Sequence, residues 1–202
     1  MARDIAYGFK LRTMEQARKL WPWLATLPVL AATAGLLRWQ GRMWLCDCGR
    51  FSLWTSEAWG AETSQQLFDP YSFTHVLHGF AFAGLLALAA PRLAARWRLT
   101  LAVALEAAWE VVENTSYVIN RYREATAALG YTGDTVVNSL GDIVACGIGF
   151  EIARRLGLRL SLLAFAFVEI ALLLWIRDSL LLNVLMLLYP SDAIRAWQSA
   201  GH

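Results

Sequence analysis

The sequence has few charged residues for its length. Asp, Glu, Lys and Arg make up 17% of the 202 residues, whereas 57% are hydrophobic, and soluble domains carry roughly a quarter charged residues. The net charge is only +2, and the arginines stand in short clusters, which argues against nucleic acid as a partner. This composition predicts an integral membrane protein.

Cysteine is scarce, because the chain has only three, too few for a disulfide framework. Cys46 and Cys48 are close enough in Cys-Asp-Cys to pair under oxidising conditions, and a disulfide and two free thiols both remain open. Cys146 lies inside an apolar run, where packing explains it. The sequence also lacks internal repeats, flexible linkers, a zinc motif and a nucleophile elbow, so a single domain over residues 1–202 is expected.

Long apolar runs are abundant instead. A helix needs roughly 17–25 residues to cross the hydrocarbon core, and the predicted spans cover residues 20–37, 73–90, 99–119, 134–153 and 160–176. The apolar run Leu180–Tyr189 is too short to span and is expected at the interface; deeper insertion would add a sixth span. The predicted fold is an all-α transmembrane helix bundle of about five spans, with a long outer loop and a short C-terminal interfacial helix.

The placement of Lys and Arg predicts the orientation. With a cytoplasmic N-terminus, the inside segments hold the basic residues of 3–19, 92–98 and 154–159. These segments are shorter than the outside ones, so their basic density is higher, as the positive-inside rule requires. We therefore expect a multi-pass protein of a bacterial inner membrane, in contact with membrane lipids. A cleaved signal peptide is the alternative for the first run, but its basic and apolar regions are long for one.

The third run carries acidic residues in a regular pattern. Glu106, Glu110, Glu113, Tyr117 and Arg121 are spaced by three or four residues, which predicts one stripe along a helix. A carboxylate at mid-bilayer costs about 3 kcal/mol, so this stripe must face protein or water. A soluble bundle with the stripe turned to solvent is the alternative, and the four other apolar runs argue against it.

Two other runs place polar residues on one face. Asp134, Asn138 and Asp142 follow at i, i+4 and i+8 in the glycine-rich fourth run, where glycine permits close helix approach. His75 and His78, three residues apart near the start of the second run, share a helix face. Such a pair can supply two metal ligands, or a base and its partner.

The predicted topology brings eight polar residues to one layer of the outer leaflet: His75, His78, Glu113, Arg121, Asp134, Asn138, Arg177 and Asp178. Glu106, Glu110, Asp142 and Glu169 are expected deeper in the membrane. Intramembrane ionisable groups mark function by default. The candidate catalytic residues are His75, His78, Glu110, Glu113, Asp134, Asn138 and Asp142. A divalent metal is the candidate cofactor, with His75, His78 and Asp134 as ligands. The candidate substrate-binding residues are Arg121, Arg123, Arg177 and Asp178, and Arg121 or Arg123 would bind an anionic headgroup. The structural alternative is that acids and arginines pair to lock the bundle.

Several sequence strings resemble a known family. They are Trp-Leu-Cys-Asp-Cys-Gly, Asp-Pro-Tyr-Ser-Phe-Thr-His-Val-Leu-His-Gly-Phe, Glu-Ala-Ala-Trp-Glu-Val-Val-Glu-Asn-Thr, Gly-Asp-Thr-Val-Val-Asn-Ser-Leu-Gly-Asp and Arg-Asp-Ser-Leu-Leu-Leu-Asn. Together they resemble an uncharacterised family of small bacterial inner-membrane proteins, classed as a domain of unknown function. A looser likeness is to VanZ-like membrane proteins, with a histidine near a helix start, an acidic helix and an Asp-x-x-x-Asn-x-x-Gly helix. In this chain those residues are His75 or His78, Glu106 and Glu110, and Asp134, Asn138 and Gly141.

Three classes of function fit this pattern. The first is hydrolysis or group transfer on a lipid-like substrate at a site open to the outer leaflet. The second is an accessory or structural subunit with a partner in a membrane complex. The third is a transporter or proton relay, which the unbroken apolar run Leu99–Leu105 on the inner side disfavours.

Overall fold

The computed structural model describes residues 24–128 and 130–200. Within these ranges the regular structure is helical, without a strand, which confirms the all-α expectation. The helices are Leu24–Trp39, α2 (Ser72–Ala89), α3 (Ala95–Glu113), α4 (Ser116–Ala125), α5 (Val136–Ile176), α6 (Leu180–Leu188) and α7 (Asp192–Ser199). The basic N-terminal segment and the start of the first predicted span lie outside the described residues.

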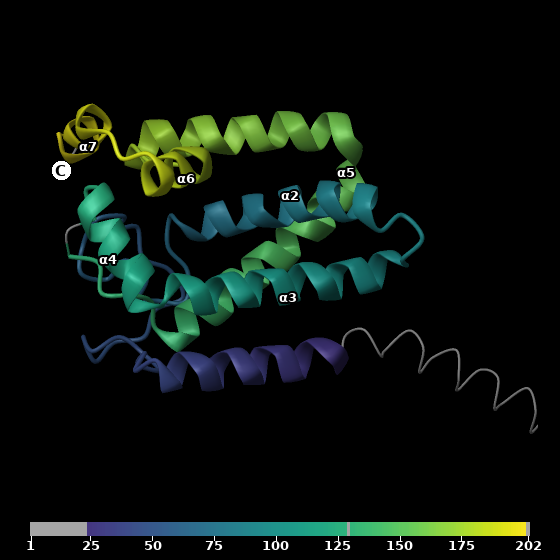
Figure 1. Cartoon of the computed structure of the whole chain (residues 1–202), viewed down its shortest axis with the longest axis horizontal. Helices are drawn as coiled ribbons and strands as arrows, with labels where there is room; N and C mark the ends of the chain where they lie inside the picture. The colour runs from purple at the N-terminus through teal and green to yellow at the C-terminus, as the bar shows by residue number, and fades with distance from the viewer. Residues whose placement is uncertain (1–23, 129, 201–202) are drawn as a thin grey trace, which may run out of the picture.

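The long helices form a bundle, and the short ones gather at one end of it. The helix Leu24–Trp39, α2 and α3 run side by side, and the first half of α5 crosses behind α2 and α3 (Figure 1). At Gly157, where φ is +72°, α5 leaves helical geometry and turns back; side-chain-bearing L residues rarely adopt this backbone conformation. The two arms of α5 correspond to the predicted runs 134–153 and 160–176.

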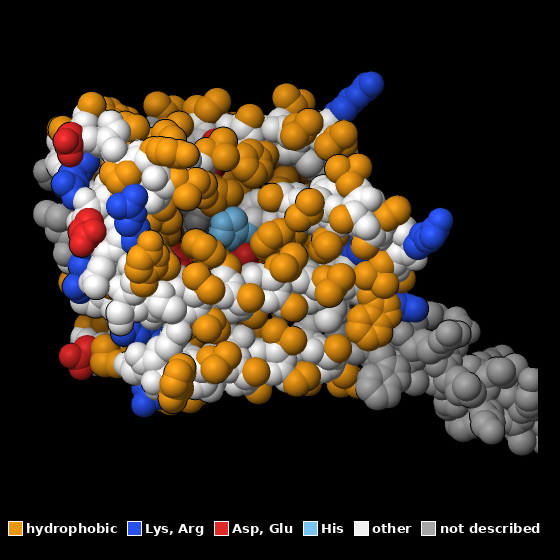
Figure 2. Space-filling model, viewed as in Figure 1, with side chains coloured by type: hydrophobic (Ala, Val, Ile, Leu, Met, Phe, Trp, Pro, Cys, Tyr) orange, Lys and Arg blue, Asp and Glu red, His pale blue; other side chains and the backbone are white. Residues whose placement is uncertain are grey.

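Two described helices, α2 and α5, are long and apolar enough to cross a membrane. The helix Leu24–Trp39 is apolar but shorter, and α3 carries two arginines and three glutamates. Length and composition therefore do not confirm five spans. Hydrophobic side chains cover the middle of the face seen in Figure 2, and most charged side chains on that face gather at the two ends of the bundle.

The predicted third run is not one helix, which corrects the sequence interpretation. α3 ends at Glu113, Asn114 has φ −81° and ψ 7°, and the extended Thr115 caps α4 by accepting a hydrogen bond from the Val118 N–H. Tyr117 is consequently 80% exposed, so the acidic stripe ends at Glu113. The Thr115 cap starts a new helix at this point, although the apolar pattern of the sequence continues through it.

The two central helices approach each other through glycines. A Cβ on Gly79 of α2 would lie 2.1 Å from the Cys146 carbonyl oxygen and 2.5 Å from the Phe150 nitrogen. A Cβ on Gly149 of α5 would lie 2.1 Å from the Val76 carbonyl oxygen. Such small-residue contacts let the backbones pack closely. They hold the start of α2, with its histidines, against the acidic face of α5.

We expect Gly79→Ala to destabilise the protein by about 2 kcal/mol or more, because the added methyl meets backbone atoms that cannot move aside. Gly84→Ala is the matched control in the same helix, since nothing lies within 4 Å of its Cβ; alanine there improves helix propensity. The midpoint of thermal unfolding in detergent measures both effects. Equal midpoints for the two variants would contradict the close α2–α5 contact.

Candidate functional site

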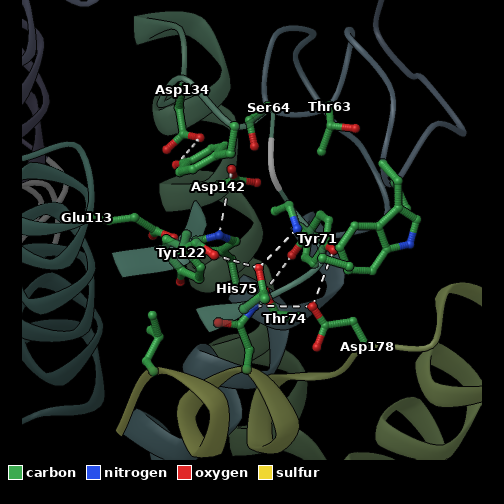
Figure 3. Close-up of a pocket in the computed structure, with 18 of the residues that line it drawn as sticks. Thr63, Ser64, Tyr71, Thr74, His75, Glu113, Tyr122, Asp134, Asp142 and Asp178 are labelled. Carbon is green, nitrogen blue, oxygen red and sulfur yellow. Dashed lines mark hydrogen bonds and ion pairs between the residues drawn. The ribbon is translucent and has the colours of Figure 1, made fainter. Parts of the chain in front are cut away.

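A cavity of about 550 Å³ lies at the end of the bundle where α2 begins and α3 ends. Its walls come from α2, α3, α4, α5 and α6, from the loop before α2, and from the segments that connect α4 to α5 and α5 to α6. The acidic and histidine side chains that line it are His75, His78, Glu113, Asp134, Asp142 and Asp178. No Lys or Arg of the described residues is among its lining residues. Figure 3 shows His75, Glu113, Asp134, Asp142 and Asp178 converging from separate elements.

The two predicted histidines meet a glutamate of α3. Glu106 Oε1 lies 2.5 Å from His75 Nδ1 and 2.9 Å from His78 Nδ1. Glu106 is fully buried, and His75 is 7% exposed. Histidine nitrogens and a carboxylate oxygen are the ligands of zinc and other divalent ions. The ligand atoms of these three residues all lie within 4.8 Å of one another, close enough to hold one ion.

The neighbouring carboxylate of Glu110 lacks hydrogen bonds. Both of its oxygens are buried and make none among the described residues, although Oε1 lies 3.3 Å from His75 Nδ1. The Glu113 Oε2 atom is likewise buried without a hydrogen bond in the described structure. His75, Glu110 and Glu113 form a second group whose ligand atoms lie within 4.8 Å of one another. Buried carboxylate oxygens without donors call for a cation or a proton.

α5 contributes Asp142 to the other side of His75. Asp142 Oδ2 lies 3.7 Å from His75 Nε2, and Asp142 Oδ1 accepts a 2.6 Å hydrogen bond from the Ser72 hydroxyl. Ser72 in turn lies beside Asp69, which accepts hydrogen bonds from the Ser64 and Tyr71 N–H groups. Burial raises the pKa of Asp69 to about 6 despite these bonds. A carboxylate beside the second nitrogen of a metal-binding histidine orients such a ligand.

Asp134 lies in a different part of the cavity from the histidines. Its carboxylate accepts hydrogen bonds from Asn114 Nδ2 (2.7 Å) and the Tyr131 hydroxyl (2.8 Å), and its N–H donates to Asn114 Oδ1. The described groups of possible metal ligands contain Glu106, Glu110 and Glu113, not Asp134. Asp134 precedes α5, which begins after the Thr135 cap, so it does not continue the helical face of Asp142.

Tyrosines complete two walls of the cavity. Tyr122 of α4 hydrogen bonds to Glu113, and burial, followed by the charge of that glutamate, raises the pKa of Tyr122 well above its usual value. Tyr71 lies at the opposite wall, with its hydroxyl 3.3 Å from Asp178 Oδ2. Burial raises the pKa of Asp178 to about 7. These walls are polar at the hydroxyl and apolar at the ring.

The three arginines predicted to bind substrate have other partners. Arg121 donates to the Leu187 carbonyl at 2.8 Å, and Arg123 donates to the Tyr131 carbonyl. Arg177 donates to the Trp197 carbonyl and lies 5.7 Å from the centre of that ring. None of them lines the cavity. Of the four predicted substrate-binding residues, only Asp178 does.

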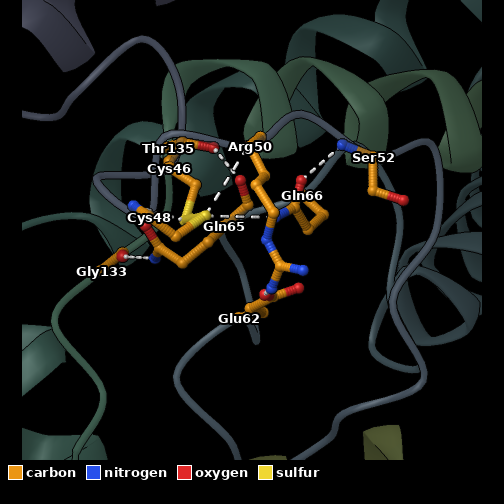
Figure 4. Close-up of a disulfide and its surroundings, with 9 residues drawn as sticks. All are labelled: Cys46, Cys48, Arg50, Ser52, Glu62, Gln65, Gln66, Gly133 and Thr135. Carbon is orange, nitrogen blue, oxygen red and sulfur yellow. Dashed lines mark hydrogen bonds and ion pairs between the residues drawn. A yellow bond between two sulfur atoms is a disulfide. The ribbon is translucent and has the colours of Figure 1, made fainter.

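The loop before α2 closes one side of the cavity and is held to α5. Asn138 is part of this attachment, because its Nδ2 donates to the Gln66 carbonyl at 2.9 Å. Gln65 donates to the Gly133 carbonyl, and Cys46 and Cys48 form a disulfide in the same loop (Figure 4). Asn138 therefore positions the loop and does not line the cavity.

The sequence interpretation missed three residues of this site as functional candidates: Glu106, Asn114 and Tyr122. Glu106 belongs to the predicted acidic stripe and is expected at a depth similar to that of Glu110 and Asp142, but it is not among the candidate catalytic residues. Both histidines contact Glu106, because His78 lies about one turn after His75 on the same face of α2. Asn114 carried no signal within an apolar run. Tyr122 became a neighbour of Glu113 only because the chain turns at Asn114.

Comparisons with known proteins give one family. Residues 37–200 match the family described as "Protein of unknown function (DUF2585)". The chain is 46% identical to a "UPF0314 protein" of Paracoccus denitrificans over 184 residues, which are 91% of this chain and 95% of the relative. It is 43% identical to one of Brucella anthropi, covering 87% of this chain and 89% of the relative. No solved structure matches. The looser likeness to VanZ-like proteins is not shown by these comparisons.

Proposed function

Since the chain belongs to the DUF2585 family of proteins of unknown function, we propose a role that rests on its own geometry. In this role it is a multi-pass bacterial inner-membrane protein that binds a divalent metal ion at His75, His78 and Glu106. It hydrolyses a lipid-like substrate. One observation carries the proposal. The fully buried Glu110 places two oxygens without hydrogen bonds beside the His75 and Glu106 pair. A divalent cation at this point would neutralise both glutamates.

The outer surface supports a membrane location. Leu88, Phe167 and Leu174 are 84%, 72% and 82% exposed, and large exposed apolar patches are rare on soluble monomers. In α3 the glutamates face inward, since Glu106 and Glu110 are 0% exposed, whereas Leu101 and Leu105 are more than 40% exposed. α3 thus presents an apolar face outward and its acids to the protein, as a polar spanning helix must.

The distribution of basic residues supports a cytoplasmic N-terminus. The α2–α3 connection and the turn at Gly157 lie at the same end of the bundle (Figure 1), and arginines project from that end (Figure 2). The opposite end, with the cavity, carries both acidic and basic side chains. By the positive-inside rule the first end is cytoplasmic. The cavity then opens toward the outer side of the membrane.

A lipid-like substrate is supported by where the cavity opens. In Figure 2 a histidine lies in a hollow that is surrounded by hydrophobic side chains, with acidic side chains beside it. Trp109 of α3 and Leu180, Val184 and Leu187 of α6 are among the apolar residues that line the cavity. An opening within an apolar surface admits a headgroup while its hydrocarbon chains stay in the bilayer.

The residues at the cavity have the chemistry that ester hydrolysis needs. A divalent ion held by His75, His78 and Glu106 would polarise the substrate and make water a better nucleophile. Glu113, which lines the cavity and has an oxygen without a hydrogen bond, would accept the proton of the attacking water. The new bond would join the water oxygen to the ester centre, the bond to the leaving oxygen would break, and Glu113 would pass the proton taken from the water to that leaving oxygen.

Lipid analysis tests this function. The purified protein, loaded with zinc, manganese or magnesium, would be incubated in vesicles of Paracoccus denitrificans lipid extract, and lipids compared by mass spectrometry. We expect one lipid to decrease and its two hydrolysis products to appear, at a rate about 100-fold lower for Glu113→Gln, as for loss of a general base. The exposed Glu124→Gln is the matched control. An unchanged lipid profile with every metal contradicts the proposal.

A further inference from the structure

The cavity extends beyond the proposed metal site to a separate corner made by the loop before α2, the start of α2 and the segment after α5. Trp59 and Tyr71 form its aromatic walls, with ring centres 6.2 Å apart and planes at 84°. The Trp59 indole is held by a 3.0 Å hydrogen bond to the Ile176 carbonyl. The carboxylate of Asp178 closes the corner, 3.3 Å from the Tyr71 hydroxyl. Figure 3 shows Tyr71 and Asp178 together on the opposite side of His75 from Glu113.

Asp178 has no cationic partner among the described residues. It is 1% exposed, and its described hydrogen bonds come from the Ser179 N–H, the Tyr71 hydroxyl and Asn183 Nδ2. The adjacent Arg177 has a left-handed backbone, with φ +53°, and its guanidinium binds Trp197 instead. A buried carboxylate that a neighbouring arginine does not neutralise is electrostatically suited to a cationic ligand.

The charge of the whole cavity has the same sign. Its lining includes four carboxylates and two histidines, without a Lys or Arg of the described chain. A metal ion at His75, His78 and Glu106 would neutralise the α3 acids but would not reach the Trp59 corner. A neutral sugar would leave Asp178 uncompensated, and a purely anionic headgroup would be repelled. Trp59 and Tyr71 are in edge-to-face contact, and an aromatic face that remains open to the cavity beside a carboxylate is suited to a quaternary ammonium.

From this juxtaposition we propose that Trp59, Tyr71 and Asp178 bind the ammonium of a zwitterionic phospholipid headgroup. The inference rests on the proposed function, because it names the substrate class of that site. With the ammonium in this corner, the phosphate of the same headgroup extends toward His75 and its metal. The corner therefore selects choline-type lipids over glycerol-type lipids and orients the bond to be cleaved.

Native mass spectrometry of the detergent-solubilised protein tests lipid selection without any need for turnover. An equimolar mixture of phosphatidylcholine and phosphatidylglycerol with the same acyl chains is the probe. We expect the wild type to bind phosphatidylcholine at least about 10-fold more than phosphatidylglycerol, which is the factor that one lost charge contact commonly changes. Asp178→Asn and Trp59→Leu should bring the ratio below about 2, while Glu124→Gln should leave it unchanged.

Further arms separate the possible outcomes. Choline chloride that displaces phosphatidylcholine only in large excess supports a lipid headgroup as the ligand, whereas choline that binds as tightly as the lipid overturns that identity in favour of a free amine. Equal binding of the two lipids by the folded wild type overturns the proposal. The doubly substituted His75→Ala, His78→Ala protein should keep the preference. A preference retained without metal or turnover would show that only the proposed hydrolysis has failed.

Discussion

The double substitution His75→Ala, His78→Ala is expected to remove stoichiometric metal from the purified protein. The wild type should contain about one divalent ion per chain, since the ligand atoms of His75, His78 and Glu106 lie within 4.8 Å of one another. Loss of two ligands should weaken binding by well over the roughly 10–100-fold that outer-shell changes cost. Inductively coupled plasma mass spectrometry measures the ion content after reconstitution and desalting.

Single substitutions distinguish the ligand set seen in the structure from the one predicted by sequence. Glu106→Gln should lose the ion, because it removes a carboxylate that contacts both histidines. Asp134→Asn should keep it, because Asp134 bonds to Asn114 and Tyr131 instead. The opposite result would restore Asp134 as the third ligand. An ion absent from folded wild type after reconstitution with zinc, manganese and magnesium would exclude the metal site.

Metal removal should also lower the stability of the wild type. A ligand that binds only the folded state, present at about 100 times its dissociation constant, adds about 2.7 kcal/mol. A chelator should therefore lower the midpoint of thermal unfolding of the wild type and leave that of the double variant unchanged. An equal shift in both proteins would show that the chelator acts elsewhere.

Much of the site could be predicted from the sequence, because helical periodicity shows which side chains share a helix face. His75 and His78 are three residues apart on α2, and Glu110 and Glu113 are three residues apart on α3, so each pair had to share a face. The structure brings both pairs together with Asp142. Helical periodicity does not show how far one helix is shifted along its axis relative to its neighbour. Periodicity placed Glu106 on the acidic stripe but did not show that both histidines lie beside it.

Other parts of the site depend on tertiary contacts that no local pattern reports. The third run breaks after Glu113, in a sequence without proline or glycine. The Thr115 hydroxyl caps the next helix by accepting from the Val118 N–H, and the Asn114 side chain accepts from the N–H of the distant Asp134. The arginines were assigned to substrate on their expected depth. In the structure Arg121 instead donates to the Leu187 carbonyl near the end of α6, and Arg123 donates to the Tyr131 carbonyl in the connection between α4 and α5. Such carbonyls are strong acceptors that a sequence does not locate.

Asn114→Asp is expected to destabilise the protein more than Gly79→Ala does, although it replaces only one amide group. Asn114 is 1% exposed, and it both donates to the Asp134 carboxylate and accepts from the Asp134 N–H. Aspartate has the same shape but no donor, so it would place a second carboxylate against that of Asp134. Breaking a buried charged contact in this way costs about 3–5 kcal/mol, close to the whole stability of a small domain.

The protein is sensitive at this position because Asn114 joins the turn after α3 to the start of α5. This contact fixes where Glu110 and Glu113 lie along the bundle relative to Asp142. Asn120→Asp on the exposed side of α4 is the matched control, since it makes the same chemical change without a buried neighbour. Size-exclusion chromatography and thermal unfolding in detergent should show a well-folded Asn120→Asp protein and little or no folded Asn114→Asp protein. If Asn114→Asp instead folds normally but stops binding metal, the Asn114–Asp134 contact serves to position the site alone and the bundle is held by the α2–α5 glycine contact.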